Sequence, residues 1–127
     1  MATDSKSRFR AALTRLVAPQ NEVHAEHEQE RAAALGGTPI ASLPMRRRAT
    51  VCGTLRSVTL RPRAGVPALE AELYDGTGSI NVVWLGRRQI AGIEPGRRIK
   101  VQGMVTRSEG EPAVFNPRYE LIARGHG

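Results

Sequence analysis

The strand pattern of this chain is organised around one stretch, Leu73-Tyr74-Asp75-Gly76-Thr77-Gly78-Ser79-Ile80. An Asp-Gly pair between two runs of alternating apolar residues is a strong signal for a tight hairpin turn. Apolar and polar side chains alternate before the turn, over residues 68–74, and apolar residues dominate after it, over residues 79–85. We therefore expect two antiparallel strands joined at Asp75-Gly76.

Strand-like patterns continue on both sides of this hairpin. Upstream, a long first strand is expected at residues 47–60, and its apolar parity shifts near Ser57, which predicts a β-bulge. Downstream we expect a short helical turn at residues 87–91, a fourth strand at 97–107 and a fifth at about 113–122. Five short strands with a helical turn between the third and the fourth follow the plan of the OB-fold, a partly open barrel. The predicted class is an all-β core that forms this five-stranded OB-fold barrel.

The chain ahead of the barrel has a helical composition. One helix is expected from Ser7 to Ala18, stopped by Pro19, and a second at about residues 22–35, ended by Gly36-Gly37. The second helix has a thin apolar face, so it is either solvated or ordered only against a partner. The predicted organisation is a helical N-terminal extension (1–37), a linker (38–45), the barrel (46–122) and a disordered tail (123–127).

The charge of the chain lies entirely in the predicted barrel. The formal net charge is +7, with a sequence pI near 11.0. Residues 1–45 carry five cations and five anions, whereas residues 46–127 carry fourteen cations and seven anions. A basic barrel favours a polyanionic partner, because neutralised phosphates release counterions on binding. The alternative is codon bias in a GC-rich genome, since seventeen of the nineteen cations are arginine.

Several function classes lack support in the sequence. Cys52 is the single cysteine, which excludes an intrachain disulfide and favours a small buried hydrophobe. There is no apolar run of about 18 residues and no signal peptide, so we expect a cytoplasmic protein without membrane insertion. His24 and His27 lie one helical turn apart, but no further Cys or His completes a metal site. No catalytic constellation appears either. We therefore expect no enzymatic activity, metal or cofactor.

Motifs along the barrel together resemble a known family. They are Asp75-Gly76-Thr77-Gly78, Ile80-Asn81-Val82-Val83-Trp84, Pro95-Gly96, Val101-Gln102-Gly103-Met104-Val105 and Asn116-Pro117-Arg118-Tyr119-Glu120. In order and spacing they resemble the OB-fold nucleic-acid-binding superfamily that includes anticodon-binding domains. They are especially similar to the wedge domain of the branched-DNA helicase RecG, and also to small stand-alone OB proteins of high-GC Gram-positive bacteria. The resemblance implies nucleic-acid binding, with DNA favoured over RNA. A phosphate loop of the helicase kind is absent, which excludes ATP-driven unwinding by this chain alone.

The candidate contact residues are cations for phosphates and aromatic residues for base stacking. The cations are Arg46, Arg47, Arg48, Arg56, Arg61, Arg63, Arg87, Arg88, Arg98, Lys100 and Arg118. The aromatic candidates are Tyr74, Trp84 and Tyr119. Trp84 shares its strand parity with Ile80 and Val82, so core packing is its alternative role. Phe115 is expected in the core.

Two acidic residues argue against the surface that an OB-fold commonly uses. Glu70 and Glu72 face outward on the second strand, where a nucleic-acid ligand would usually lie. Either they pair with Arg56 or Arg98, or nucleic acid binds the loops and the side of the first and fourth strands.

Two hypotheses about function follow. The first is binding of single-stranded or branched nucleic acid, with DNA favoured, RNA possible and low sequence specificity. The alternative is a protein–protein interaction module that uses the N-terminal helices, without direct nucleic-acid binding. Its supporting feature is an apolar stripe formed by Phe9, Leu13, Leu16 and Val17.

Overall fold

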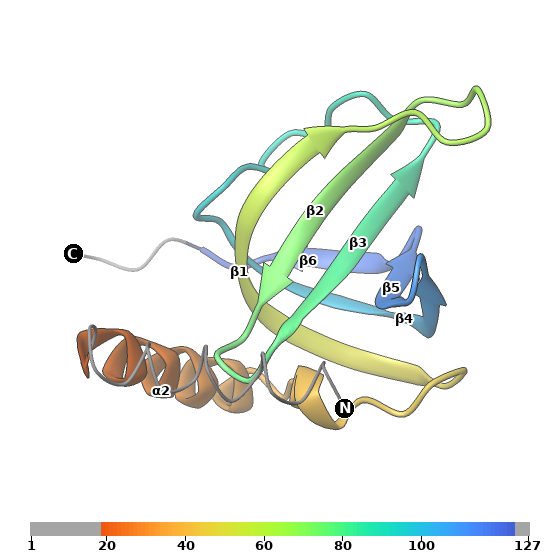
Figure 1. Ribbon diagram of the computed structural model, residues 1–127. Helices are drawn as coiled ribbons and strands as arrows, with labels where there is room; N and C mark the ends of the chain where they lie inside the picture. Colours follow the sequence, from red (N-terminus) through yellow and green to blue (C-terminus); the bar gives the residue numbers. More distant parts are fainter. Residues whose placement is uncertain (1–18, 124–127) are drawn as a thin grey trace.

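The computed structural model describes residues 19–123 of the chain (Figure 1). The helix expected at residues 7–18, with its apolar stripe, lies outside the described residues, as does most of the predicted tail. The elements in chain order are the helix α2 (Pro19–Ala34), the short 3-10 helix η1 (Ile40–Ser42) and the strands β1 (Arg48–Leu60), β2 (Ala68–Tyr74), β3 (Ser79–Leu85), β4 (Arg98–Ser108), β5 (Glu111–Phe115) and β6 (Arg118–Leu121).

Five of these strands close into a ring. Their order is β1-β2-β3-β5-β4, and β4 pairs back onto β1. β3 and β5 are parallel, and the other neighbours in the ring are antiparallel. β1 pairs with β4 through its first half and with β2 through its second half, so one long strand serves both sides of the ring. The predicted five-stranded architecture is confirmed.

A bulge at Arg56 lets β1 change partners. Leu55 pairs with Leu73, whereas Ser57 pairs with Glu72, which leaves Arg56 as an extra residue on β1. An extra residue bends the strand and increases its twist, and β1 is strongly curved in Figure 1. The bulge predicted near Ser57 is therefore present.

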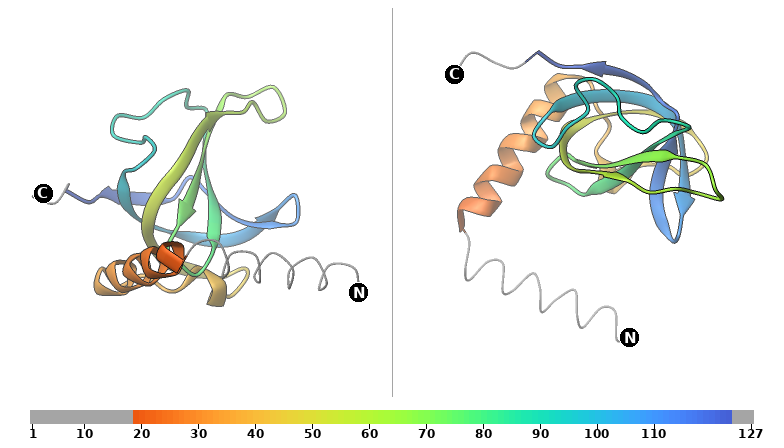
Figure 2. Two further views of the ribbon diagram at one scale, coloured as in Figure 1. Left: turned by 60° about the vertical axis from the view of Figure 1, so that its left-hand side comes forward. Right: turned by 90° about the horizontal axis from the view of Figure 1, so that it is seen from above.

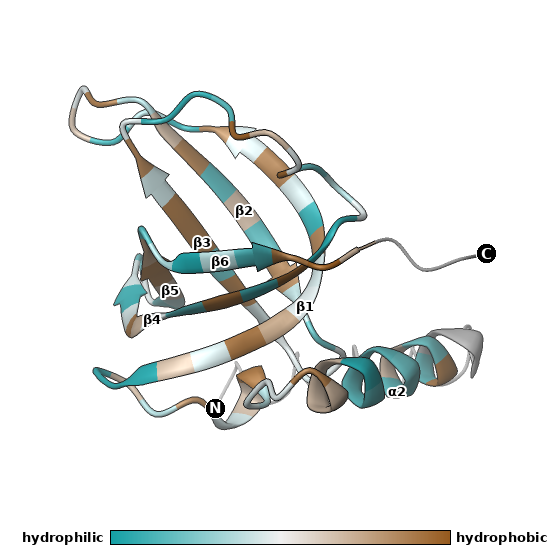
Figure 3. Ribbon diagram, turned by 180° about the vertical axis from the view of Figure 1, so that it is seen from behind, coloured by the Kyte–Doolittle hydropathy of each residue, from teal (hydrophilic) through white to brown (hydrophobic). Residues whose placement is uncertain are grey.

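The apolar face of each strand points into the ring. Leu55, Leu73, Ile80, Val101 and Val105 are among the side chains that are at most 1% exposed. Hydrophobic and hydrophilic residues alternate along β2 in Figure 3, as expected for a strand with one buried face. Segments outside the strands complete the same core, because Ile40, Ile90 and Ile93 join its cluster.

The predicted fifth strand is divided into β5 and β6. Asn116, between them, has a left-handed φ of 49°, and Pro117 has no N–H for a strand ladder. The Asn116 side-chain oxygen accepts a hydrogen bond from the Leu85 N–H at 2.9 Å, and its own N–H donates to the Val83 carbonyl at 2.7 Å. These hydrogen bonds hold the residue between β5 and β6 in place against the end of β3.

The segment between β3 and β4 differs from the predicted helical turn at residues 87–91. It consists of irregular chain and turns, including hydrogen bonds from Ile93 N–H to Ile90 and from Arg97 N–H to Glu94. Gly86 and Gly92, which flank residues 87–91, have φ angles of 77° and 84°, so a right-handed helix cannot extend past either end of these five residues. The segment packs as an irregular cap on the ring instead.

Helix α2 confirms the second predicted helix and begins earlier, at Pro19. Proline is favourable in a first helical turn, where its missing N–H has no helical partner. The helix lies outside the ring, beside the β2–β3 turn (Figure 2). It is packed rather than solvated on all sides, because Ala32 is 5% exposed and Glu28 only 3% exposed.

The Asp75-Gly76-Thr77-Gly78 turn fastens the segment ahead of the ring to the β2–β3 hairpin. The Asp75 carboxylate is buried and accepts hydrogen bonds from the Thr77 N–H at 2.8 Å and the Thr77 hydroxyl at 2.6 Å. Its other oxygen accepts the Ile40 N–H at 2.9 Å. Residues 38–45, predicted as a linker, therefore supply the core with Ile40, which this bond holds in place.

Candidate nucleic-acid interface

Arg61 and Arg63, two of the predicted phosphate contacts, are engaged with Glu70 on the outer face of β2. Glu70 lies 3.0 Å from Nη2 of Arg63 and 3.4 Å from Nη1 of Arg61. Arg63 also donates a hydrogen bond to the Ser108 hydroxyl at 3.0 Å, and its guanidinium lies 5.4 Å from the centre of the Phe115 ring. Glu70 thus pairs with the loop arginines and with neither Arg56 nor Arg98.

Arg56 and Tyr74 form a second paired cluster on the same face. The guanidinium carbon of Arg56 is 3.6 Å from the centre of the Tyr74 ring, within the range of a cation–π contact. Arg56 also lies 3.8 Å from a carboxylate oxygen of Glu72, which confirms for Glu72 the predicted pairing with Arg56. One face of the Tyr74 ring is therefore covered by a side chain of the protein itself.

The surface between the two clusters is rich in carboxylates. A depression there is lined by Glu70, Glu72, Glu109 and Glu111, and Arg61 is the one cation among its described lining residues. Asn81 donates a hydrogen bond to Glu111 at 3.4 Å across the same depression. A phosphate backbone would meet repulsion here, because the nearby arginines are already paired with carboxylates.

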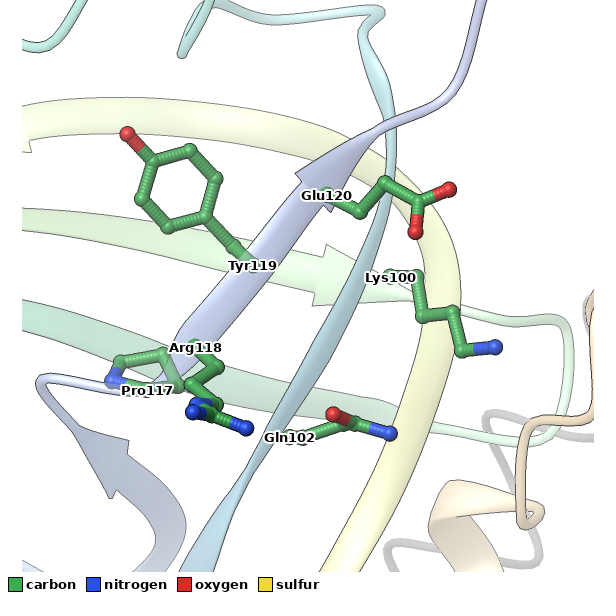
Figure 4. A pocket seen from close by; sticks show the side chains of 6 residues that line it. All are labelled: Lys100, Gln102, Pro117, Arg118, Tyr119 and Glu120. Atoms are coloured by element: carbon green, nitrogen blue, oxygen red, sulfur yellow. The ribbon is translucent and has the colours of Figure 1, made fainter.

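The outer side of β1, β4 and β6 carries a different surface, which we call the β4/β6 surface. Cross-strand pairing places Thr50, Gln102 and Arg118 in one row and Cys52, Lys100 and Glu120 in the next. Two depressions of about 490 Å³ each lie on it, and both are lined by Gln102 and Arg118. Figure 4 shows the first of them. The residues of this surface are Arg48, Thr50, Lys100, Gln102, Met104, Arg118 and Glu120.

The cations of the β4/β6 surface have no carboxylate partners within residues 19–123. Salt bridges in this part of the chain involve Arg31, Arg56, Arg61, Arg63 and Arg98. They leave out Arg48, Lys100 and Arg118, as well as Arg46 and Arg47, which precede β1. These charges remain available to an outside ligand.

Arg98 shares the outer side of β4 with Lys100, as predicted, but it is directed to helix α2. It lies 3.5 Å from the buried Glu28 carboxylate, which also accepts a hydrogen bond from the Thr54 hydroxyl at 3.0 Å. Arg87 and Arg88 lie elsewhere again, exposed in the segment after β3. The structure therefore does not gather the predicted cations into one patch.

The remaining aromatic candidates differ in exposure. Trp84 is 5% exposed and belongs to the core, so its ring offers no open surface for a base. Tyr119 on β6 is 41% exposed and packs against Trp84, with ring centres 5.7 Å apart and an interplanar angle of 78°. Phe115 is half-buried on the outer side of β5 and not in the core cluster, contrary to the prediction, because it pairs with Val83, which lies on the outer side of β3 although it is itself fully buried.

Sequence reasoning missed the uncharged part of the β4/β6 surface. Gln102 and Met104 continue the outward alternation that begins at Lys100, so the signal for them was present in the sequence. Neither residue is a cation or an aromatic residue, the two side-chain types expected to contact phosphates and bases. Glu120 and Thr50 depend on pairings with β4 that no local pattern reveals.

Other chemistry has little support in the described residues. Cys52 is fully buried beneath the end of α2, and this burial raises the pKa of its thiol. No group of three or more His, Cys, Asp or Glu side chains that could hold a metal occurs in the part of the chain that the structure describes. In the same part, none of the helices has the length and apolar character to cross a membrane.

Comparison with known proteins agrees with the ring topology. The family model described as an OB-fold nucleic acid binding domain, of the anticodon-binding type, matches residues 49–124, from β1 to the end of β6. The chain belongs to this family. A search of curated proteins gave no match. Membership supports nucleic-acid binding in general as the function of the OB-fold domain, and the two outer surfaces described above differ in how well they fit that function.

Proposed function

We propose that this OB-fold protein is a non-enzymatic, cytoplasmic protein that binds single-stranded or branched DNA through the β4/β6 surface. The observation that carries the proposal is the contrast between two outer faces of one ring. Cations on the β2 face are paired with Glu70 and Glu72, whereas those on the β4/β6 surface have no ion-pair partner in the described residues. RNA is the second ligand class. The preference for DNA rests on the resemblance to the RecG wedge domain.

The charges of the β4/β6 surface suit a phosphate backbone rather than a particular base sequence. Arg48, Lys100 and Arg118 come from three adjacent strands, and Glu120 is the acidic member of the surface. Neighbouring strands lie about 4.8 Å apart, so these cations are spread over a few residue spacings rather than focused on one point. Contacts to phosphates position a nucleic acid but carry no direct sequence information. We therefore expect low sequence specificity.

Fluorescence anisotropy with labelled single-stranded DNA, a Y-fork and single-stranded RNA, each over a range of salt concentrations, tests the proposal. Lys100→Glu and Arg118→Glu should each weaken binding to every ligand. Arg107→Glu is the matched control, because it makes the same charge change at an exposed site on β4. Arg107 lies seven residues beyond Lys100, roughly 23 Å along the strand.

The salt dependence of the binding constant distinguishes a defined phosphate-binding site from general electrostatic attraction to a basic protein. Replacing a cation that contacts a phosphate lowers the slope of log K against log salt by about 1, and the control should leave the slope unchanged. Equal losses in all three variants would show that only net charge matters. The proposed function would be contradicted if the protein bound none of the three ligands at low salt.

A further inference from the structure

The two sides of strand β6 differ: one carries the charged side chains of the β4/β6 surface, and the other carries the aromatic ring of Tyr119. Successive side chains of a strand point to opposite sides, so the Tyr119 side chain is directed away from those of Arg118 and Glu120 (Figure 4), although Tyr119 also contributes to the lining of the first depression on the β4/β6 surface. Within residues 19–123, β6 pairs with β4 alone, through residues 118–121. Its second edge therefore pairs with no other strand of the described residues, and a ligand that crosses this edge meets both sides of the strand.

Tyr119 is suited to hold a base on its side of β6. The ring stands edge-on against the buried Trp84, which supports it and leaves the side chain 41% exposed. The other aromatic side chains of residues 19–123 are less available, because Arg56 lies over Tyr74 and Arg63 lies near the Phe115 ring. A supported, exposed aromatic ring is a sequence-tolerant platform for one base.

We propose that a single-stranded nucleic acid crosses the free edge of β6, with its phosphates beside Lys100 and Arg118 and one base stacked on Tyr119. This inference rests on the proposed function and narrows its ligand to single strands. A duplex can place phosphates near Arg118, but its bases are paired and stacked internally. It therefore has no free base to reach Tyr119 across the strand.

The test uses the full chain, an oligo-dT single strand and a blunt duplex of the same strand length. Tyr119→Ala should weaken binding of the single strand by about tenfold, as expected for loss of one stacked base. The salt slope should not change, because no phosphate contact is lost. Tyr119→Phe keeps the ring and should bind like the original chain. Duplex binding should be the same for all variants.

Tyr74→Ala is the matched control, because Tyr74 is the chain's other tyrosine and is covered by Arg56. It should leave single-strand binding unchanged, and circular dichroism with thermal unfolding checks that each variant folds. Unchanged single-strand binding by Tyr119→Ala, together with weakened binding by Arg118→Glu, would overturn the stacking inference and leave the proposed function standing. Equal weakening of single strand and duplex by Tyr119→Ala would also overturn it. The proposed function itself would be refuted if the unaltered chain bound neither these two ligands nor a Y-fork or single-stranded RNA at low salt.

Discussion

Asp75 accepts hydrogen bonds from the turn that contains it and from the segment ahead of the ring. Its Oδ1 receives the N–H groups of Thr77 and Gly78 and the Thr77 hydroxyl, and its Oδ2 receives the Ile40 N–H. The side chain is 2% exposed, so water cannot replace these contacts without the structure opening. The Asp-Gly signal in the sequence indicates a turn, but the tie to Ile40 is a second role for the same residue.

Asp75→Ala should lower the free energy of unfolding by about 3 kcal/mol. The reason is that one buried donor, the Ile40 N–H, and three partly buried donors lose their acceptor, and each unsatisfied buried group costs roughly 1–3 kcal/mol. Urea unfolding followed by circular dichroism measures the change. Glu109→Ala, at an exposed position in the β4–β5 turn, is the control and should stay within about 0.5 kcal/mol of the original chain. An Asp75 variant as stable as this control would contradict the assigned role.

At the scale of an element, helix α2 is held by a polar contact as well as by apolar packing. Glu28 contacts the Thr54 hydroxyl on β1 and Arg98 on β4, and Ala32 packs one turn further along. Close approach also matters, because a Cβ at Gly76 would overlap the Ala25 carbonyl oxygen of the helix. A buried carboxylate that meets a hydroxyl and a guanidinium can specify where a weakly apolar helix docks.

Glu28→Gln should loosen α2 on the ring. The neutral amide of the variant cannot form the ion pair with Arg98. The Arg98 guanidinium then keeps its charge beside the helix without a carboxylate partner. Amide hydrogen exchange measured by mass spectrometry should be at least several-fold faster in the peptide covering residues 22–35, while the strands exchange as before. Glu26→Gln makes the same change at an exposed position of the helix. Equal exchange in both variants would show that Glu28 does not anchor α2.

The elements that the sequence predicted well are those set by local patterns. The first four strands and the bulge in β1 follow from period-two alternation and its shift, which neighbouring residues determine. The break between β5 and β6 depends on hydrogen bonds from Asn116 to the distant β3. For the same reason the sequence identified the cations but, apart from the pair of Arg56 with Glu72, not their partners. Whether Arg98 meets Glu28 or a ligand depends on how α2 docks, and no local pattern encodes that.

At the scale of the whole molecule, the excess positive charge of residues 46–127 is unevenly distributed. Arginines on the β2 face are balanced by glutamates, and Arg98 is balanced by Glu28 of α2. The net charge of the ring is therefore left on the β4/β6 surface and on Arg46, Arg47, Arg87, Arg88, Arg97 and Arg107, which have no salt bridge within residues 19–123. A uniform codon bias explains the number of arginines but not their separation into paired and unpaired groups.

The division of the chain into extension, linker and barrel stays a prediction, and the structure indicates where it can be tested. Residues 38–45 behave as part of the ring, because Ile40 is 6% exposed within the core cluster and Leu43 and Met45 pack against it. The Thr38 N–H also donates to the Thr50 carbonyl on β1 at 2.8 Å. A stable minimal domain should therefore begin near residue 38 rather than at residue 46.

Two truncated chains, 38–127 and 46–127, test this boundary. The shorter chain should be less stable than the longer by about 3 kcal/mol or more. Loss of a buried isoleucine removes roughly 2–3 kcal/mol, and Asp75 also loses the Ile40 N–H. Urea unfolding of both chains measures the difference, and anisotropy with single-stranded DNA measures function. Chain 38–127 keeps the whole β4/β6 surface and Tyr119, so its affinity should stay close to that of the full chain. Equal stability of the two truncated chains would show that residues 38–45 act as a linker, as the sequence predicts, and not as part of the folded domain.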